Sequence, residues 1–201
     1  MNKLIIIFFI LVFCSSCKEN TTGNPKLDDK EIILNNIEPG LYSNPENLGT
    51  FSGKFLKAGD FAPDYLLNKG TESEFSLSDI RGKVVYIKFW RSRCSSCRSS
   101  IPVLVSKYNS LNDTNFVVIT VTSDQSERVS IETVSTFIED FDMNKWINIY
   151  DGMDNTNSIF ANYNIFGTPN GFIIDKTGKI VQQISPKSSD FEKIVQSELS
   201  R

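Results

Sequence analysis

A Cys-x-x-Cys pair at the junction of a predicted strand and a predicted helix constrains the fold of this chain most. Residues 84–90 are rich in β-branched and aromatic side chains, and the run is short enough to be a buried strand. Residues 95–111 follow with apolar side chains at helical spacing, although Pro102 predicts a kink in that helix. Cys94 and Cys97 therefore lie where a helix leaves a central strand.

The rest of the chain after residue 57 continues this alternation. Further strands are predicted at 116–121 and 147–150, further helices at 129–138, 158–163 and 188–199, and a hairpin at 171–174 and 179–184. Strands and helices that alternate and end in a hairpin and a helix predict an α/β fold, with a mixed central sheet flanked by helices on both faces.

The position of the cysteine pair predicts redox chemistry. Unpaired backbone N–H groups and the helix dipole favour negative charge at a helix N-terminus and lower the pKa of a thiol there. Arg91, Arg93 and Arg98 flank the pair and would act in the same direction. Cys94 is the expected nucleophile and Cys97, one turn further along, the expected resolving thiol of a redox-active disulfide. The alternative is a disulfide that only stabilises an exported domain.

Composition excludes several other kinds of chemistry. The chain has no histidine, which removes the usual neutral-pH base and the commonest metal ligand. A second Cys-x-x-Cys, Cys14 and Cys17, lies too far from the first for a structural zinc site, so we expect no metal and no cofactor. Lys and Arg number 21 against 24 Asp and Glu, a net charge of -3 that favours no nucleic acid partner.

The N-terminus is typical of an export signal. Lys3 precedes an uninterrupted apolar run, residues 4–13, which is about half the length of a membrane span. Small serines then precede Cys17, after which the chain turns polar, and this resembles a bacterial lipoprotein signal with Cys17 as the lipid anchor. Cys14 departs from that pattern, because an aliphatic residue usually stands there. An ordinary cleaved signal with a soluble product, or a short core helix, is the alternative.

This interpretation divides the chain into three parts. Residues 1–16 are a predicted lipoprotein signal peptide, 17–57 a lipid-anchored tether of mixed polar composition, and 58–201 the folded domain. We therefore expect a protein held at a membrane of the bacterial cell envelope, with its domain outside the cytoplasm, in the periplasm or exposed at the surface.

The domain carries a set of motifs at residues 59–65, 77–85, 89–90 with the cysteine pair, 167–169 and 174–180. Together these motifs closely resemble the TlpA/ResA branch of thioredoxin-like proteins over about residues 58 to 190. The resemblance implies a thioredoxin-like fold with an N-terminal strand extension and thiol-disulfide oxidoreductase activity, as a reductase. It implies that Pro169 is cis beside the redox pair, and that the Thr168 backbone pairs with a bound substrate segment. Trp90 matches the aromatic pair ahead of the site and is expected either to contact substrate or to pack in the core.

Three positions depart from the family pattern. Arg93 stands where tryptophan usually precedes the first cysteine, which makes the docking surface more cationic. Ser95 and Ser96 replace the commoner dipeptide between the cysteines. Lys88 occupies the place of the buried acid that assists proton transfer in thioredoxin. A buried lysine could serve as the base there, because desolvation lowers its pKa, or its ammonium group could reach water.

Competing functions remain. A peroxiredoxin would carry Pro and Thr or Ser where this chain has Ile87 and Arg91. A copper-delivering relative would need histidine as a copper ligand, and this chain has none. A thioredoxin-like lipoprotein that only binds a partner is the non-catalytic alternative. The oxidoreductase interpretation implies protein or peptide disulfides as substrates and an upstream membrane thiol donor of electrons.

Overall fold

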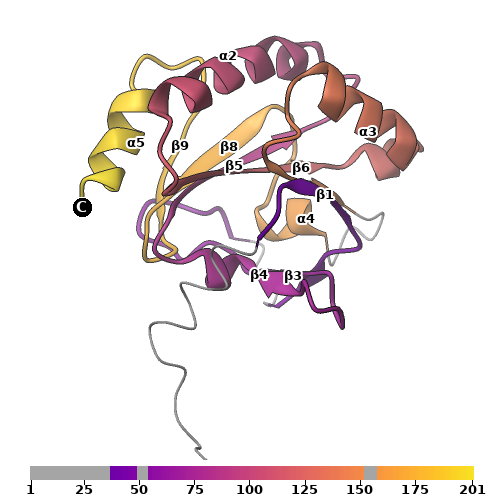
Figure 1. Cartoon of the computed structure of the whole chain (residues 1–201), viewed down its shortest axis with the longest axis horizontal. Helices are drawn as coiled ribbons and strands as arrows, with labels where there is room; N and C mark the ends of the chain where they lie inside the picture. Colours follow the sequence, from indigo (N-terminus) through magenta and orange to yellow (C-terminus); the bar gives the residue numbers. More distant parts are fainter. Residues whose placement is uncertain (1–36, 49–53, 152–157) are drawn as a thin grey trace, which may run out of the picture.

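A computed structural model describes residues 37–48, 54–151 and 158–201. Its centre is a six-stranded mixed sheet in the order β1-β7-β6-β5-β8-β9, shown edge-on in Figure 1. A three-stranded antiparallel sheet, β2-β3-β4, lies below it. The strands of the large sheet are β1 (Gly40–Ser43), β5 (Val84–Trp90), β6 (Phe116–Thr122), β7 (Ile147–Tyr150), β8 (Asn170–Ile174) and β9 (Ile180–Gln183).

Strand direction follows from the connections. The pairs β5–β6, β6–β7 and β1–β7 are parallel, whereas β8 pairs antiparallel with both β5 and β9. Successive crossovers from β5 to β6 to β7 move in one direction along the sheet, so right-handed connections put both of their helices on the same face. The connection from β7 to β8 runs back the other way, and its helix lies on the opposite face.

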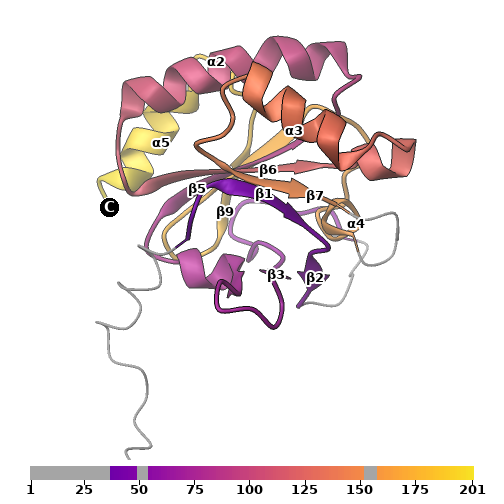
Figure 2. The ribbon, with the colours of Figure 1, turned by 45° about the vertical axis from the view of Figure 1, so that its right-hand side comes forward.

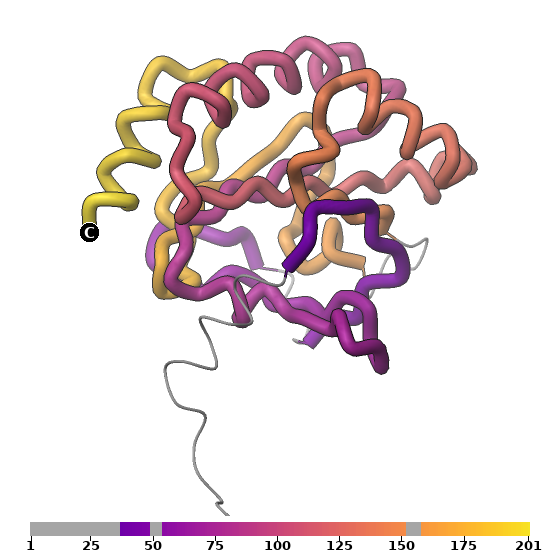
Figure 3. Tube along the Cα trace, viewed as in Figure 1, coloured from indigo at the N-terminus to yellow at the C-terminus, as the bar shows by residue number. Residues whose placement is uncertain are grey.

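The two faces therefore carry different layers. One is covered by α2 (Ser95–Leu111), α3 (Ile131–Asp140) and α5 (Phe191–Leu199), with α5 packed beside α2 (Figure 3). The other is covered by α4 (Ile159–Asn162), by the 3-10 helix η1 (Leu77–Ile80) and by the small sheet of β2 (Glu46–Asn47), β3 (Tyr65–Leu67) and β4 (Phe75–Ser76), as the turned view of Figure 2 shows. A second 3-10 helix, η2 (Asp124–Glu127), follows β6.

Each layer encloses its own apolar core. One core lies between the sheet and the three longer helices, and the other between the sheet and α4, η1 and the small sheet. β5 contributes alternate side chains to both, so all seven of its residues are buried. This explains a sequence in which apolar residues run continuously rather than alternating with polar ones.

The N-terminal strand corrects the predicted domain boundary. Gly40–Ser43 pairs with Ile147–Tyr150 at the edge of the central sheet, and β2 joins the small sheet. Residues 40–47 thus belong to the folded unit, which begins before residue 58, and the segment 17–57 is not a tether throughout. The predicted N-terminal strand extension is confirmed. The predicted signal peptide, residues 1–16, and the predicted lipid anchor Cys17 lie outside the described residues.

The thioredoxin-like α/β fold is confirmed, with a mixed sheet and helices on both faces. Every predicted strand and helix is present within a few residues of its predicted bounds. Pro102 does not interrupt α2. In the part of the chain that the structure describes, none of the helices has the length and apolar character needed to span a membrane.

Candidate active site

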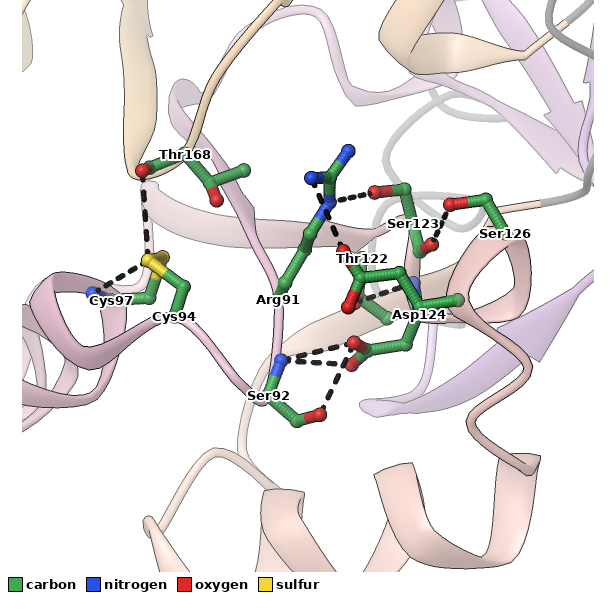
Figure 4. Close-up of polar contacts among 10 residues, drawn as sticks. Arg91, Ser92, Cys94, Cys97, Thr122, Ser123, Asp124, Ser126 and Thr168 are labelled. Atoms are coloured by element: carbon green, nitrogen blue, oxygen red, sulfur yellow. Dashed lines mark hydrogen bonds and ion pairs between the residues drawn. A yellow bond between two sulfur atoms is a disulfide. The ribbon is translucent and has the colours of Figure 1, made fainter.

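Cys94 and Cys97 form a disulfide at the N-terminus of α2, with 5.2 Å between their Cα atoms. Cys94 is the N-cap residue, and its Sγ accepts a hydrogen bond from the backbone N–H of Cys97 at 3.1 Å (Figure 4). Cys94 is partly exposed, whereas Cys97 is fully buried. A thiolate on Cys94 would receive that same N–H bond together with the helix dipole, and both stabilise negative charge on the sulfur.

The loop before β8 places a backbone acceptor beside the disulfide. Thr168–Pro169 is a cis peptide bond, as expected, and the Thr168 carbonyl oxygen lies 3.6 Å from Cys94 Sγ (Figure 4). The antiparallel register of β5 with β8, which sets Phe89 opposite Asn170, fixes this approach. Pro169 precedes the strand and Thr168 is only partly buried, so this loop is partly exposed beside the disulfide.

Trp90 does not have the predicted contact with substrate. Its side chain is 0% exposed, its ring stacks on Phe137 with centroids 4.7 Å apart, and its Nε1 donates to Thr120 Oγ1 at 3.0 Å. The packing alternative is therefore the one present. Both faces of β5 are covered, and residue 90 lies on the face that packs against α3.

The three arginines near the disulfide have different roles. Arg91 is held by Ser123 Oγ at 2.7 Å and by Glu127 at 3.3 Å. Arg98 lies over the rings of Phe137 and Phe141, and its guanidinium also donates to the Ser92 carbonyl at 3.4 Å. Arg93 is exposed and makes no ion pair within the described residues. Only Arg93 is thus uncommitted beside Cys94.

Lys88 is buried on the side of β5 that faces α2. It is 0% exposed, and its Nζ donates to Ser100 Oγ at 2.9 Å, while Ser100 Oγ donates to the Cys97 carbonyl at 2.9 Å. Burial, helped by the positive charge of Lys187, lowers its pKa to about 8. The alternative in which the ammonium reaches water is wrong. Lys88 also lines a cavity of about 220 Å³ beneath Pro169.

Asp124 is a site residue that the sequence interpretation missed. Fully buried at the end of β6, it accepts hydrogen bonds from the Ser92 backbone N–H at 3.0 and 3.1 Å and from the Ser92 hydroxyl at 3.2 Å (Figure 4). It thereby ties the loop that carries Cys94 to the neighbouring strand. The available signal was a polar residue directly after a parallel strand, where sites of open α/β sheets lie.

Phe166 was also missed. Its side chain is 83% exposed two residues before Thr168, and with Phe160 and Arg91 it lines a cavity of about 280 Å³. A large apolar side chain this exposed, next to the cis-proline loop, is suited to contact with another protein. The only signal in the sequence was that Phe166 belongs to the segment leading into Thr168 and Pro169, which was already expected to lie beside the disulfide.

Among the described residues, no group of three or more Cys, Asp or Glu side chains is placed to hold a metal ion. The cysteine pair is instead joined within one helical turn.

Residues 58–183 match the AhpC/TSA family. The chain belongs to this family. Curated relatives include the thiol-disulfide oxidoreductase ResA of Bacillus cereus, 26% identical over 129 residues, which are 64% of this chain and 70% of the relative. The protein of that name from Geobacillus kaustophilus is 29% identical over 155 residues, 77% of this chain and 82% of the relative.

Solved structures agree with these relatives. The thioredoxin domain of a thiol-disulfide oxidoreductase from Bacteroides vulgatus superimposes with a TM-score of 0.57 at 28% identity, and the match covers 71% of this chain and 97% of that domain. The chain is a TlpA/ResA-like thiol-disulfide oxidoreductase, and its chemistry is redox exchange at disulfides.

Proposed function

We propose that this protein reduces disulfides of client proteins outside the cytoplasm, with Cys94 as the attacking thiolate and Cys97 as the resolving thiol. The observation that carries the proposal is the asymmetry of the pair. Cys94 caps α2, is open to a client and faces the Thr168 carbonyl, whereas Cys97 is 0% exposed behind it.

Each turnover exchanges two electrons and needs no cofactor. The Cys94 thiolate attacks one sulfur of the client disulfide, a new bond forms between them, and the other client sulfur leaves as a thiolate. Cys97, once deprotonated, attacks Cys94 Sγ, which breaks the mixed disulfide and releases the second client thiolate. The client is reduced, the Cys94–Cys97 pair is oxidised, and an upstream membrane thiol donor restores the pair.

Client binding in this proposal uses the surface around Cys94. The client segment adds as a short strand along the Thr168 backbone, next to Pro169, and Arg93 contacts it from the other side of the sulfur. The approach of the Thr168 carbonyl to Cys94 and the exposure of Arg93 support this arrangement.

Lys88 is proposed to move the proton of Cys97. In its neutral form the amine accepts the proton as Cys97 attacks, and a pKa of about 8 leaves roughly a tenth of the amine neutral at pH 7. The hydrogen bonds from Lys88 to Ser100 and from Ser100 to the Cys97 carbonyl support this role, because they hold the amine beneath the turn that carries Cys97.

The location of the protein in the cell is a further part of the proposal. Cleavage before Cys17 and acylation of that residue would anchor the protein in a membrane of the bacterial envelope, since more than one acyl chain gives stable attachment. Mass spectrometry of the mature N-terminus tests this part. An unmodified N-terminus beyond Cys17 would remove the anchor.

The test of the reaction compares the full-length protein with Cys94→Ala and Cys97→Ala in the reduction of a disulfide-bonded protein. We expect Cys94→Ala to lose activity and Cys97→Ala to accumulate a mixed disulfide with the client, visible on a non-reducing gel. Ser95→Ala, an exposed neighbour, is the control that keeps both thiols. Equal rates for wild type and Cys94→Ala would leave only a binding function.

A further inference from the structure

The charges of this chain are unevenly distributed around its redox site. Although the net charge is -3, no Asp or Glu occurs between Asp79 and Asp113. The cations of that stretch, which holds β5, the disulfide and α2, are Arg81, Lys83, Lys88, Arg91, Arg93, Arg98 and Lys107. The site therefore lies in a locally cationic part of an acidic protein.

Three exposed cations border the disulfide, and we call them the cationic rim: Arg93, Arg98 and Lys187. Arg93 directly precedes Cys94. The Arg98 guanidinium turns back to the Ser92 carbonyl, and Lys187 Nζ donates to Ser99 Oγ at 2.8 Å on α2. All three charges are thus attached to the loop before Cys94 or to the first turns of α2.

Two carboxylates beside the loop that precedes the disulfide are already engaged. Glu127 pairs with Arg91, and Asp124 is buried against Ser92. Within the described residues, none of the rim cations forms an ion pair. The rim therefore presents positive charge that no direct ion pair within the described residues offsets.

A client cysteine must reach bonding distance of Cys94 Sγ. At about 3.3–3.6 Å per extended residue, client side chains within about three residues of that cysteine lie over the rim. We infer that the preferred clients of this protein carry Asp or Glu within about three residues of the attacked cysteine. This inference rests on the proposed function and names the class of substrate that the same site selects.

The expected size of the effect follows from exposed charge pairs. A single exposed ion pair changes a binding constant by only about two- to fivefold, because water screens it. Three such pairs, together with electrostatic steering of the encounter, give a preference on the order of tenfold at low salt. At about 0.5 M salt the Debye length is shorter than the span of the rim, so the preference should shrink to about twofold.

The experiment uses pre-reduced full-length protein in single turnover with two disulfide-bonded peptides. Both have the same cysteine spacing, but one has Asp and Glu beside the attacked cysteine and the other has Asn and Gln there. The second-order rate of enzyme oxidation is followed by acid quenching and mass spectrometry. We expect the acidic peptide to react about tenfold faster at low salt, and the triple variant Arg93→Gln, Arg98→Gln, Lys187→Gln to lose that preference.

Lys145→Gln is the matched control. It removes one exposed charge at the start of β7, the opposite edge of the parallel strands from Cys94, and should keep the preference. Equal rates for the two peptides, a preference unchanged at high salt, or a preference retained in the triple variant would each overturn the inference while leaving the reductase proposal intact. Failure of both peptides to react, with wild type equal to Cys94→Ala, would instead count against the proposed function itself.

Discussion

Lys88 donates a hydrogen bond from its Nζ to Ser100 Oγ at 2.9 Å, inside the protein and without contact with solvent. A charged amine in such a place loses hydration that one hydroxyl does not replace. This is why burial lowers the pKa of Lys88 to about 8. The same relationship has consequences for both stability and catalysis.

The first prediction concerns stability against pH. Below pH 8 the lysine is protonated in the folded and the unfolded protein, so the full cost of burying its charge, about 3 kcal/mol, is present. Between pH 8 and 10.5 the unfolded chain binds more protons, and raising the pH stabilises the folded state. Urea unfolding of the oxidised protein should show Lys88→Met more stable than wild type at pH 7, with the difference largely gone at pH 10.5. A difference that does not change with pH would contradict the lowered pKa.

The second prediction concerns the pH dependence of client release. If neutral Lys88 takes the Cys97 proton, the rate at which Cys97 resolves the mixed disulfide should rise through pH 8 in wild type. Lys88→Met should lose this rise and be about 100-fold slower at pH 8, the usual worth of a general base. Stopped-flow single turnovers measure it, with Lys83→Met as control, because Lys83 bonds the Thr114 carbonyl at the start of the same strand. If the resolution rate of Lys88→Met kept the pH profile of wild type, Lys88 would not be the base that takes the Cys97 proton.

The third prediction concerns Asp124. Removing its carboxylate leaves the Ser92 N–H buried without an acceptor and frees the loop before Cys94. Asp124→Ala should destabilise the fold by about 2 kcal/mol and slow disulfide exchange, whereas Asp124→Asn, which keeps one acceptor oxygen, should recover much of both. Asp113→Ala is the control, since that carboxylate accepts from an exposed backbone N–H at Asn115. If Asp124→Ala altered stability alone, the carboxylate would have no part in positioning Cys94.

Most of the elements and the position of the cysteine pair could be predicted from local patterns in the sequence. The strand, the cysteine pair and α2 are contiguous, so their spacing alone places Cys94 at a helix N-terminus. β1 could not be found in this way, because four residues with one glycine carry little pattern and their partner, β7, lies about a hundred residues away. The sequence also could not tell on which face of the sheet the Trp90 side chain lies. Because β5 is buried on both sides, the alternation of its residues does not distinguish the two faces.

The partners of the buried polar side chains could not be predicted for a related reason. Lys88 is buried because Ser100, on a different element, supplies a partner, and sequence spacing does not show which element packs over a strand. Asp124, at the start of η2, and Ser92, just after β5, are likewise joined between segments that follow two different strands. Such partners depend on the register of the folded sheet, which no single segment contains.

The fourth prediction concerns Phe166. Because its ring is exposed beside Thr168, Phe166→Ser should raise the KM for a protein client about fivefold, in line with the loss of one apolar contact, and leave reduction of a small aromatic disulfide unchanged. Phe61→Ser is the matched control. Phe61 is 60% exposed but bridges to Lys179 at the far end of the β8–β9 hairpin. Equal effects of the two variants would assign Phe166 no role in client binding.

The fifth prediction concerns Gly171, which follows the cis-proline loop and lies opposite Lys88 in the sheet. A Cβ at this position would overlap the ring and hydroxyl of Tyr86, whose OH is fixed by the Ile184 carbonyl at 3.0 Å. Gly171→Ala should therefore destabilise the protein by about 1–3 kcal/mol. It should also slow client reduction, because a shift of β8 away from β5 that relieves the overlap would take the Thr168 carbonyl away from Cys94.

Gly167 supplies the control for this substitution within the same loop. A Cβ there would meet open space and its φ is not positive, so Gly167→Ala should be neutral or stabilise the fold by about 0.5 kcal/mol through the unfolded chain. Urea midpoints and single-turnover rates of the two variants separate a steric effect from a general loss of loop freedom. If Gly171→Ala proved as stable and as active as Gly167→Ala, close packing against Tyr86 would not be what holds the cis-proline loop at the disulfide.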